Sequence, residues 1–161
     1  MDKLLLYIVV IVGIAIGVAM PSSKRGVPEG APHRVTTPSE APRETQLERT
    51  GSGHFYTYAN VDGQLVKFVV DTGADVVVLT PEDAERAGIK FNSANFDVVG
   101  EGAGGPIRGE NVMIDSIELD GKLVNDVRGV VIENASRSLL GQSYLSRMGE
   151  VQMRGDTMVL R

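Results

Sequence analysis

The feature that most limits the fold of this chain is an alternation of short apolar runs and turn signals between Gly53 and Arg161. The runs are rich in Val, Ile, Tyr and Phe, and Asp62-Gly63 and Asp120-Gly121 are dipeptides that favour tight hairpins. This pattern is typical of a mainly antiparallel β domain. The predicted strands are residues 54–61, 64–70, 75–79, 96–99, 111–119, 122–132, 150–154 and 157–160.

Two short helices interrupt the predicted strands. Thr80 is expected to cap the first, Pro81 suits its first position, and Gly88 ends it. The second is expected to follow the segment 139–141 and to run to Met148, where the next glycine stops it. The expected fold class is therefore mainly β with two short helices.

The composition excludes several classes of function. The formal net charge is −5 at pH 7, so the chain lacks the basic face that a general nucleic-acid binder needs. It contains no cysteine, which rules out disulfide frameworks, thiol catalysis and cysteine-ligated zinc. With only His33 and His54, a metal site built from several histidines is not expected. We therefore expect no metal, no cofactor and no nucleic-acid partner.

The amino-terminal third differs from the rest of the chain. Residues 4–20 form an uncharged apolar run, which as a helix would span about 26 Å, near the short limit for crossing a bilayer. A membrane anchor is favoured over a cleaved signal peptide because signal-peptide cores are usually shorter, although either reading fits residues 1–20. Residues 21–52 are rich in proline and poor in apolar residues, which predicts a disordered linker. The folded domain is expected to span residues 53–161.

The segment 68–74 carries the clearest chemical signal. Asp71 follows three apolar residues and precedes a hydroxyl and a glycine. A buried carboxylate is costly unless it is paired or hydrogen-bonded. Thr72 can supply a hydroxyl, and Gly73 permits a tight turn and the close approach of other groups. An ordinary Asp-Thr-Gly turn between two strands would show the same tripeptide, so this motif alone leaves both interpretations open.

A second motif favours a catalytic interpretation. Ser138-Leu139-Leu140-Gly141 places two aliphatic residues and a glycine just before the predicted second helix. An apolar-apolar-Asp-Thr-Gly-Ala motif followed by apolar-apolar-Gly and a short helix resembles the retropepsin-like aspartic proteases, in particular the bacterial, membrane-anchored, single-domain members. The resemblance covers most of residues 53–161. It implies a closed, barrel-like acid-protease subunit that forms a two-fold dimer.

The resemblance also implies a role for each motif residue. Asp71 would be the catalytic aspartate, and Thr72, Gly73 and Ala74 would complete the active-site loop. The supporting loop beneath it would consist of Leu139, Leu140 and Gly141. The flap that covers the substrate would be formed by Gly100, Glu101, Gly102, Ala103, Gly104 and Gly105.

Aspartic proteolysis constrains the assembly. It needs two carboxylates that share one proton, so that one activates a water and the other donates to the scissile carbonyl. The chain contains one Asp-Thr-Gly, so a second copy must supply the partner Asp71, and an active enzyme is expected to be a homodimer. The resemblance further implies a bacterial inner-membrane protein, tethered through residues 4–20. Its periplasmic catalytic domain would hydrolyse an exported or membrane polypeptide.

Two alternatives remain open at this point. The same fold could serve as a non-catalytic peptide-binding or dimerisation module that takes up an extended peptide as an added strand. The protein could also be a self-processing enzyme whose main target is its own linker, residues 21–52. Retention of activity in an Asp71→Asn variant would exclude the aspartic mechanism.

Overall fold

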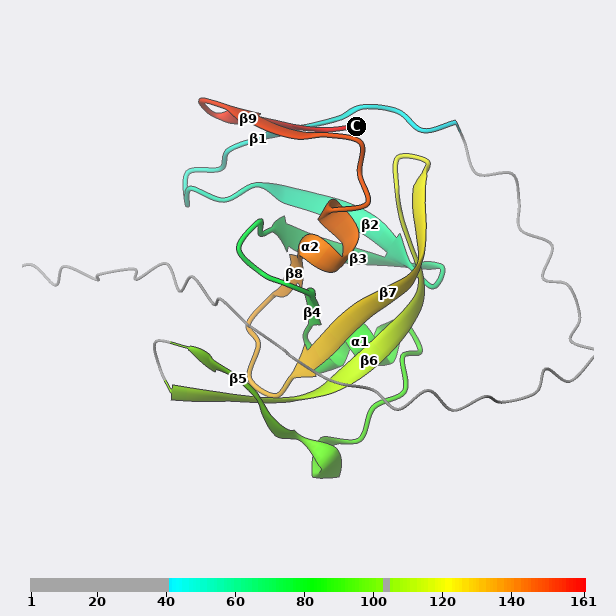
Figure 1. Cartoon of the computed structure of the whole chain (residues 1–161), viewed down its shortest axis with the longest axis vertical. Coiled ribbons are helices and arrows are strands. Elements are labelled where there is room, and N and C mark those ends of the chain that lie inside the picture. Colours follow the sequence, from blue (N-terminus) through cyan, green and yellow to red (C-terminus); the bar gives the residue numbers. More distant parts are fainter. Residues whose placement is uncertain (1–40, 103–104) are drawn as a thin grey trace, which may run out of the picture.

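The computed structural model describes residues 41–102 and 105–161 (Figure 1). Within these residues it confirms the predicted mainly β fold with two short helices. The elements follow in the order β1 (Thr45–Glu48), β2 (Tyr56–Val61), β3 (Gln64–Val70), β4 (Val77–Leu79), α1 (Pro81–Arg86), one 3₁₀ turn (Ser93–Asn95), β5 (Asp97–Gly102), β6 (Gly105–Leu119), β7 (Lys122–Ile132), β8 (Ser138–Leu140), α2 (Gln142–Leu145), β9 (Val151–Arg154) and β10 (Thr157–Leu160).

A closed barrel forms the body of the molecule. The main sheet has the strand order β2-β3-β8-β4-β7-β6-β5. Strand β2 also pairs with β6, through Asn60 opposite Glu118 and Val61 opposite Ile117, and this pairing closes the first six strands into a ring. Most pairs are antiparallel, but β3 pairs with β8 and β4 with β7 in parallel. A separate sheet of β1, β10 and β9 lies at one end of the barrel (Figure 1).

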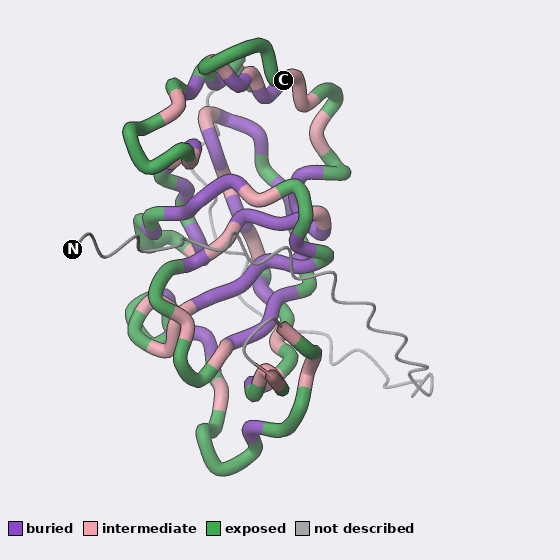
Figure 2. Tube along the Cα trace, turned by 90° about the vertical axis from the view of Figure 1, so that its left-hand side faces the viewer, coloured by how far each residue is buried: buried purple, intermediate pink, exposed green. Residues whose placement is uncertain are grey.

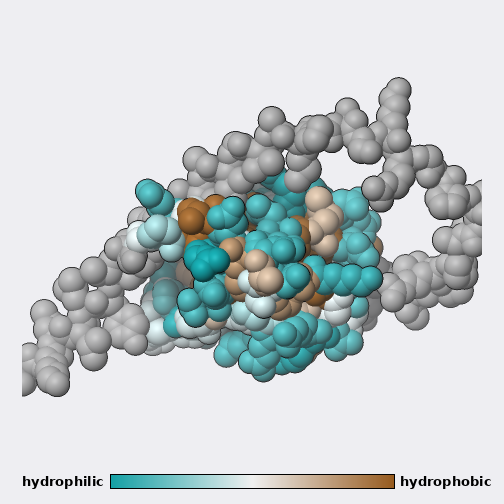
Figure 3. All heavy atoms as spheres, turned by 90° about the horizontal axis from the view of Figure 1, so that it is seen from below, coloured by the Kyte–Doolittle hydropathy of each residue, from teal (hydrophilic) through white to brown (hydrophobic). Residues whose placement is uncertain are grey.

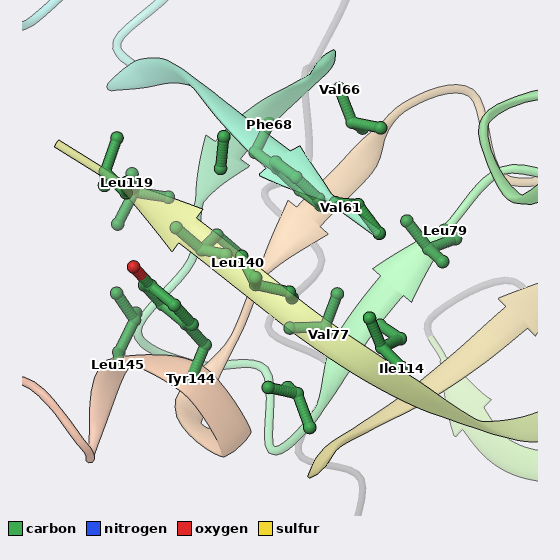
Figure 4. Close-up of a cluster of buried hydrophobic side chains, with 14 of the residues drawn as sticks. Val61, Val66, Phe68, Val77, Leu79, Ile114, Leu119, Leu140, Tyr144 and Leu145 are labelled. Atoms are coloured by element: carbon green, nitrogen blue, oxygen red, sulfur yellow. The ribbon is translucent and has the colours of Figure 1, made fainter. Parts of the chain in front are cut away.

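Alternation along the strands fills the barrel with apolar side chains. In β2, every second residue from Thr57 to Val61 is buried and the residues between them are exposed. The interior side chains come from opposite walls, and Figure 4 shows Phe68, Leu140 and Tyr144 among them. The trace in Figure 2 likewise alternates between buried and exposed residues. Phe68 and Val70 at the end of β3 belong to this core, so the core extends up to the residue before Asp71.

The local signals for turns and for the first helix are confirmed. Asp62 and Gly63 have φ values of 49° and 86°, as type I′ hairpin turns require, and the Asp120-Gly121 hairpin repeats this geometry. The hydroxyl of Thr80 accepts a hydrogen bond of 3.1 Å from the amide of Asp83, and Pro81 is the first residue of α1. The second helix, α2, ends at Leu145 rather than at the predicted residue 148.

Strand β1 lies inside the segment predicted as a linker, residues 21–52. It pairs antiparallel with β10, with Thr45 opposite Leu160 and Leu47 opposite Met158. Its alternate residues Thr45 and Leu47 are buried, so this short stretch joins the folded body even though too few of its residues are apolar to show a periodic pattern. The remaining boundaries of the predicted division into residues 1–20, 21–52 and 53–161 stay a prediction.

The predicted bacterial inner-membrane location, with a periplasmic catalytic domain, is corrected by the structure. Across residues 41–102 and 105–161, the longer of the two α-helices has six residues, and no helix is long and apolar enough to cross a membrane. A crossing helix needs about 20 apolar residues. The predicted anchor, residues 4–20, lies outside the described residues, as does most of the predicted linker.

Candidate active site

Asp71 lies at the point where β3 ends, in a tight loop whose hydrogen bonds fix its position. Its amide donates to the carbonyl of Leu140 at 3.1 Å, and its Oδ1 accepts from the amide of Gly73 at 2.9 Å. The carbonyl of Asp71 accepts from the amide of Ala74 at 3.3 Å. The Asp71 side chain is half-buried, whereas Thr72 and Gly73 are exposed. One carboxylate oxygen is thus held by the loop, and within the described residues the other makes no hydrogen bond.

Strand β8 holds the Asp71 loop from the side. It runs parallel to β3, with Val69 opposite Leu139 and Val70 opposite Leu140. Leu140 is fully buried and points into the barrel core (Figure 4). Leu139 is half-buried on the opposite face, in a second apolar cluster built around Val78. The structure therefore brings together the two motifs predicted as active-site loop and supporting loop.

Gly141 is required by the close contact between these two loops. A Cβ atom at this position would lie 2.2 Å from the carbonyl oxygen of Val76 and 2.7 Å from that of Ala74. Its φ of −98° is open to any residue, so the requirement is for space and not for an unusual backbone conformation. Glycine is thus the residue that lets β8 approach the Asp71 loop.

The first residues of α2 clamp the Asp71 loop. The amide of Gln142 donates to the carbonyl of Ala74 at 2.7 Å, and its side-chain Nε2 donates to the carbonyl of Thr72 at 2.8 Å. The buried Ser143 hydroxyl accepts from the amide of Val77 at 3.0 Å and donates to the carbonyl of Arg128 at 2.6 Å. Sequence reasoning missed both residues. The available signal was the position of Ser143 between the apolar residues of β8 and Tyr144. A serine buried at such a position needs hydrogen-bond partners for its hydroxyl.

The start of β8 is fastened to α1. The hydroxyl of Ser138 donates to Oδ2 of Asp83 at 2.5 Å and accepts from the amide of Thr80 at 3.2 Å. Asp83 also pairs with Arg86 one turn further along α1. The register of β8 against β3 is therefore fixed at both of its ends, which limits movement of the loop that carries Asp71.

Four of the six residues predicted as a flap lie in two paired strands, β5 and β6. Gly100, Glu101 and Gly102 lie in β5 and Gly105 in β6, with Gly102 opposite Gly105. The remaining two, Ala103 and Gly104, lie outside the described residues. Figure 1 shows β5 and the start of β6 as a ribbon that projects from the barrel. The described part of the glycine-rich stretch, residues 100–102 and 105, is therefore strand. Its role as a flap stays a prediction.

The base of this hairpin packs against the strand that follows the Asp71 loop. Val99 of β5 contacts the cluster formed by Val76, Val78 and Val130. Figure 3 shows the molecule from below, and this face carries both apolar and hydrophilic side chains. Within the described residues, no group of three His, Asp or Glu side chains is placed to hold a metal ion.

A closed barrel with an Asp-Thr-Gly loop supported by an apolar-apolar-Gly strand defines the retropepsin-like class of aspartic proteases. Comparisons with known proteins agree. Residues 57–147 match the family described as "gag-polyprotein putative aspartyl protease". The crystal structure of a retropepsin-like aspartic protease from Rickettsia conorii superposes with a TM-score of 0.61 at 29% identity, covering 73% of this chain and 88% of that chain.

Two curated proteins are also similar to this chain. An uncharacterised protein from the cobV 5′ region of Sinorhizobium sp is 37% identical over 79% of this chain and 55% of its own length. An uncharacterised protein of Rickettsia prowazekii is 32% identical over 73% of this chain and 51% of its own length. The chain thus spans about half the length of the curated relatives it matches. Since the family match covers more than half of the chain, the protein belongs to the gag-type, retropepsin-like aspartyl protease family.

Proposed function

We propose that this protein is a homodimeric aspartic endopeptidase whose catalytic water is activated by two Asp71 carboxylates, one from each copy. The observation that carries the proposal is the geometry of the Asp71 loop. Its Oδ1 is held by the amide of Gly73, its other oxygen makes no hydrogen bond within the described residues, and the loop is clamped by Gln142. A carboxylate fixed in this way is oriented for acid–base chemistry.

A second copy is needed because the reaction uses two carboxylates. The sequence holds one Asp-Thr-Gly, so a single chain offers half of a site. Thr72 and Gly73 are exposed beside the half-buried Asp71, which leaves the tip of the loop open to the same loop of a partner. Such a contact would place the site on the two-fold axis of the dimer.

The reaction then follows from the pair. Two carboxylates in contact hold a single proton, because like charges this close do not both ionise. The ionised Asp71 takes a proton from the water as it attacks the scissile carbonyl, and the protonated Asp71 donates to the carbonyl oxygen. When the tetrahedral intermediate collapses, the C–N bond breaks and the Asp71 that took the proton from water gives it to the leaving amine. The other Asp71 regains its proton from the hydroxyl of the intermediate. In this proposal the substrate is an extended polypeptide covered by the β5–β6 hairpin.

The direct test is an Asp71→Asn variant of the full chain, incubated with an unfolded protein and read by mass spectrometry of the peptides. Asparagine keeps the oxygen that accepts from Gly73 but does not act as a base. Cleavage should fall by a factor of about 100 or more, with no change in urea unfolding. Asp115→Asn, an exposed carboxylate on β6, is the matched control and should retain activity. Equal cleavage by both variants would refute the proposal.

A further inference from the structure

Three basic side chains converge on one tyrosine ring near the end of β3. The Nζ of Lys67 lies 4.8 Å from the centroid of the Tyr56 ring, within range of a cation–π contact. The His54 ring meets the Tyr56 ring edge-on, with centroids 6.2 Å apart. In addition, Nη1 of Arg137 donates to the Tyr56 hydroxyl at 3.2 Å. We call Tyr56, Lys67 and Arg137 the basic patch.

The two cations of the basic patch lack an acidic partner within the described residues. Other arginines of the chain are neutralised: Arg161 pairs with both Glu44 and Glu150. In contrast, no carboxylate of residues 41–102 or 105–161 lies within ion-pair distance of Lys67 or Arg137, and both side chains are exposed. Two unneutralised cations that contact the same tyrosine, on a chain of net charge −5, create a local site for an anionic group.

The sheet register places the basic patch beside the candidate active site. Tyr56 lies opposite Val69, and Val69 lies opposite Leu139, so the three form one row across β2, β3 and β8. Asp71 follows Val69 by two residues, about 7 Å along the strand direction. Lys67 and Val69 share one face of β3, because residues two apart in a strand point to the same side. Asp71 is the first residue after β3, so this face ends next to the Asp71 loop.

We propose that Lys67 and Arg137 select polypeptide substrates that carry an acidic side chain, Glu or Asp, within about three residues of the bond to be cleaved. Lys67 precedes Asp71 by four residues, about 13 Å along the strand direction, and its Nζ extends to the ring of Tyr56, whose row lies about 7 Å from Asp71. An offset between these two values corresponds to two to four residues of an extended peptide, which advances about 3.3 Å per residue. The inference rests on the proposed protease function and deepens it. In a two-fold dimer each copy supplies one basic patch, so an acidic residue is selected on either side of the scissile bond.

Direct binding tests the inference independently of catalysis. The probe is a fluorescein-labelled octapeptide of Val, Ala and Phe with either Glu or Gln three residues from its central bond. Affinities are measured by fluorescence anisotropy with the full chain carrying Asp71→Asn. The Glu peptide should bind about three- to tenfold more tightly than the Gln peptide at low salt. The ratio should approach one in 1 M salt, where the Debye length is about 3 Å.

Charge variants separate recognition from a structural role. Arg137→Gln and Lys67→Gln should each lower the Glu/Gln ratio, whereas the exposed Arg154→Gln, which makes the same charge change on β9, should leave it intact. The Arg137→Glu variant should bind a peptide with Lys at the variable position more tightly than the peptide with Glu there. Equal affinity for the Glu and Gln peptides, binding of neither, or a ratio unchanged by the patch variants would overturn the inference.

Cleavage by the wild-type chain then reports separately on the proposed function. If the wild type cleaves both peptides with the same kcat/KM, the acidic preference is refuted while the protease proposal stands. If the Glu peptide binds selectively but no peptide is cleaved, the patch is a recognition site on a protein that lacks the proposed activity.

Discussion

Replacing Gly141 by alanine tests how tightly the Asp71 loop is built. The added Cβ would lie 2.2 Å from the carbonyl oxygen of Val76, about 0.8 Å inside the 3.0 Å approach that Cβ atoms respect. The obstructing atoms belong to the backbone, so β8 or the loop must move. Overpacking of this kind costs about 1–3 kcal/mol. A displacement approaching 1 Å at a catalytic group lowers the rate about 100-fold.

We therefore expect Gly141→Ala to lower the free energy of unfolding by about 2 kcal/mol and kcat/KM by about 100-fold. Both are measured on one preparation, by urea unfolding and by cleavage of a fluorogenic peptide. Gly149→Ala is the matched control beyond the end of α2, because its Cβ would lie 3.5 Å from the nearest atom, an ordinary contact. If Gly141→Ala matches this control in both measurements, the close contact does not position Asp71.

Three further outcomes follow from buried polar groups. Ser143→Ala leaves the amide of Val77 without its partner and should cost about 1–3 kcal/mol in urea unfolding, whereas Ser146→Ala, at the exposed residue that follows α2, should cost under about 0.5 kcal/mol. Tyr144→Phe removes the buried bond from the tyrosine hydroxyl to the carbonyl of Lys122 and should cost about 1 kcal/mol by the same measurement. Burial lowers the pKa of Lys122 below 10.5, so the unfolded chain binds this proton more readily and the free energy of unfolding rises as the pH increases toward 10.5. Lys122→Met should reduce this rise, measured by urea unfolding at several pH values. An unchanged pH dependence would contradict the lowered pKa of Lys122.

The parts of the fold predicted from sequence are those set by neighbouring residues. The Asp62-Gly63 hairpin and the capped helix α1 each need a few local residues in the right order, and both were confirmed. Strands β1 and β8 were missed because four and three residues are too few to show a period. Their conformation comes from pairing with β10 and β3, which the local sequence does not encode.

The candidate site likewise contains features that the sequence predicts and features that only long-range strand pairing creates. The motifs of Asp71 and Gly141 were predicted to lie together because the two motifs are specific as a pair, and the structure joins them through a backbone hydrogen bond from Asp71 to Leu140. Their catalytic and supporting roles stay predictions. The basic patch was not found, because Tyr56 and Arg137 are 81 residues apart in the chain. Only the β2–β3 and β3–β8 pairings bring them together, so no pattern of spacing in the sequence predicts their contact.

The central claim is that one site needs an Asp71 from each of two chains, and co-refolding tests it most directly. Wild-type chain and Asp71→Asn are mixed in equal amounts, unfolded together, refolded and assayed at constant total concentration. If both carboxylates are required, random pairing leaves about one quarter of the wild-type activity. If each chain acts with its own Asp71, about one half remains. A value near one quarter supports the two-carboxylate site, and a value near one half contradicts it.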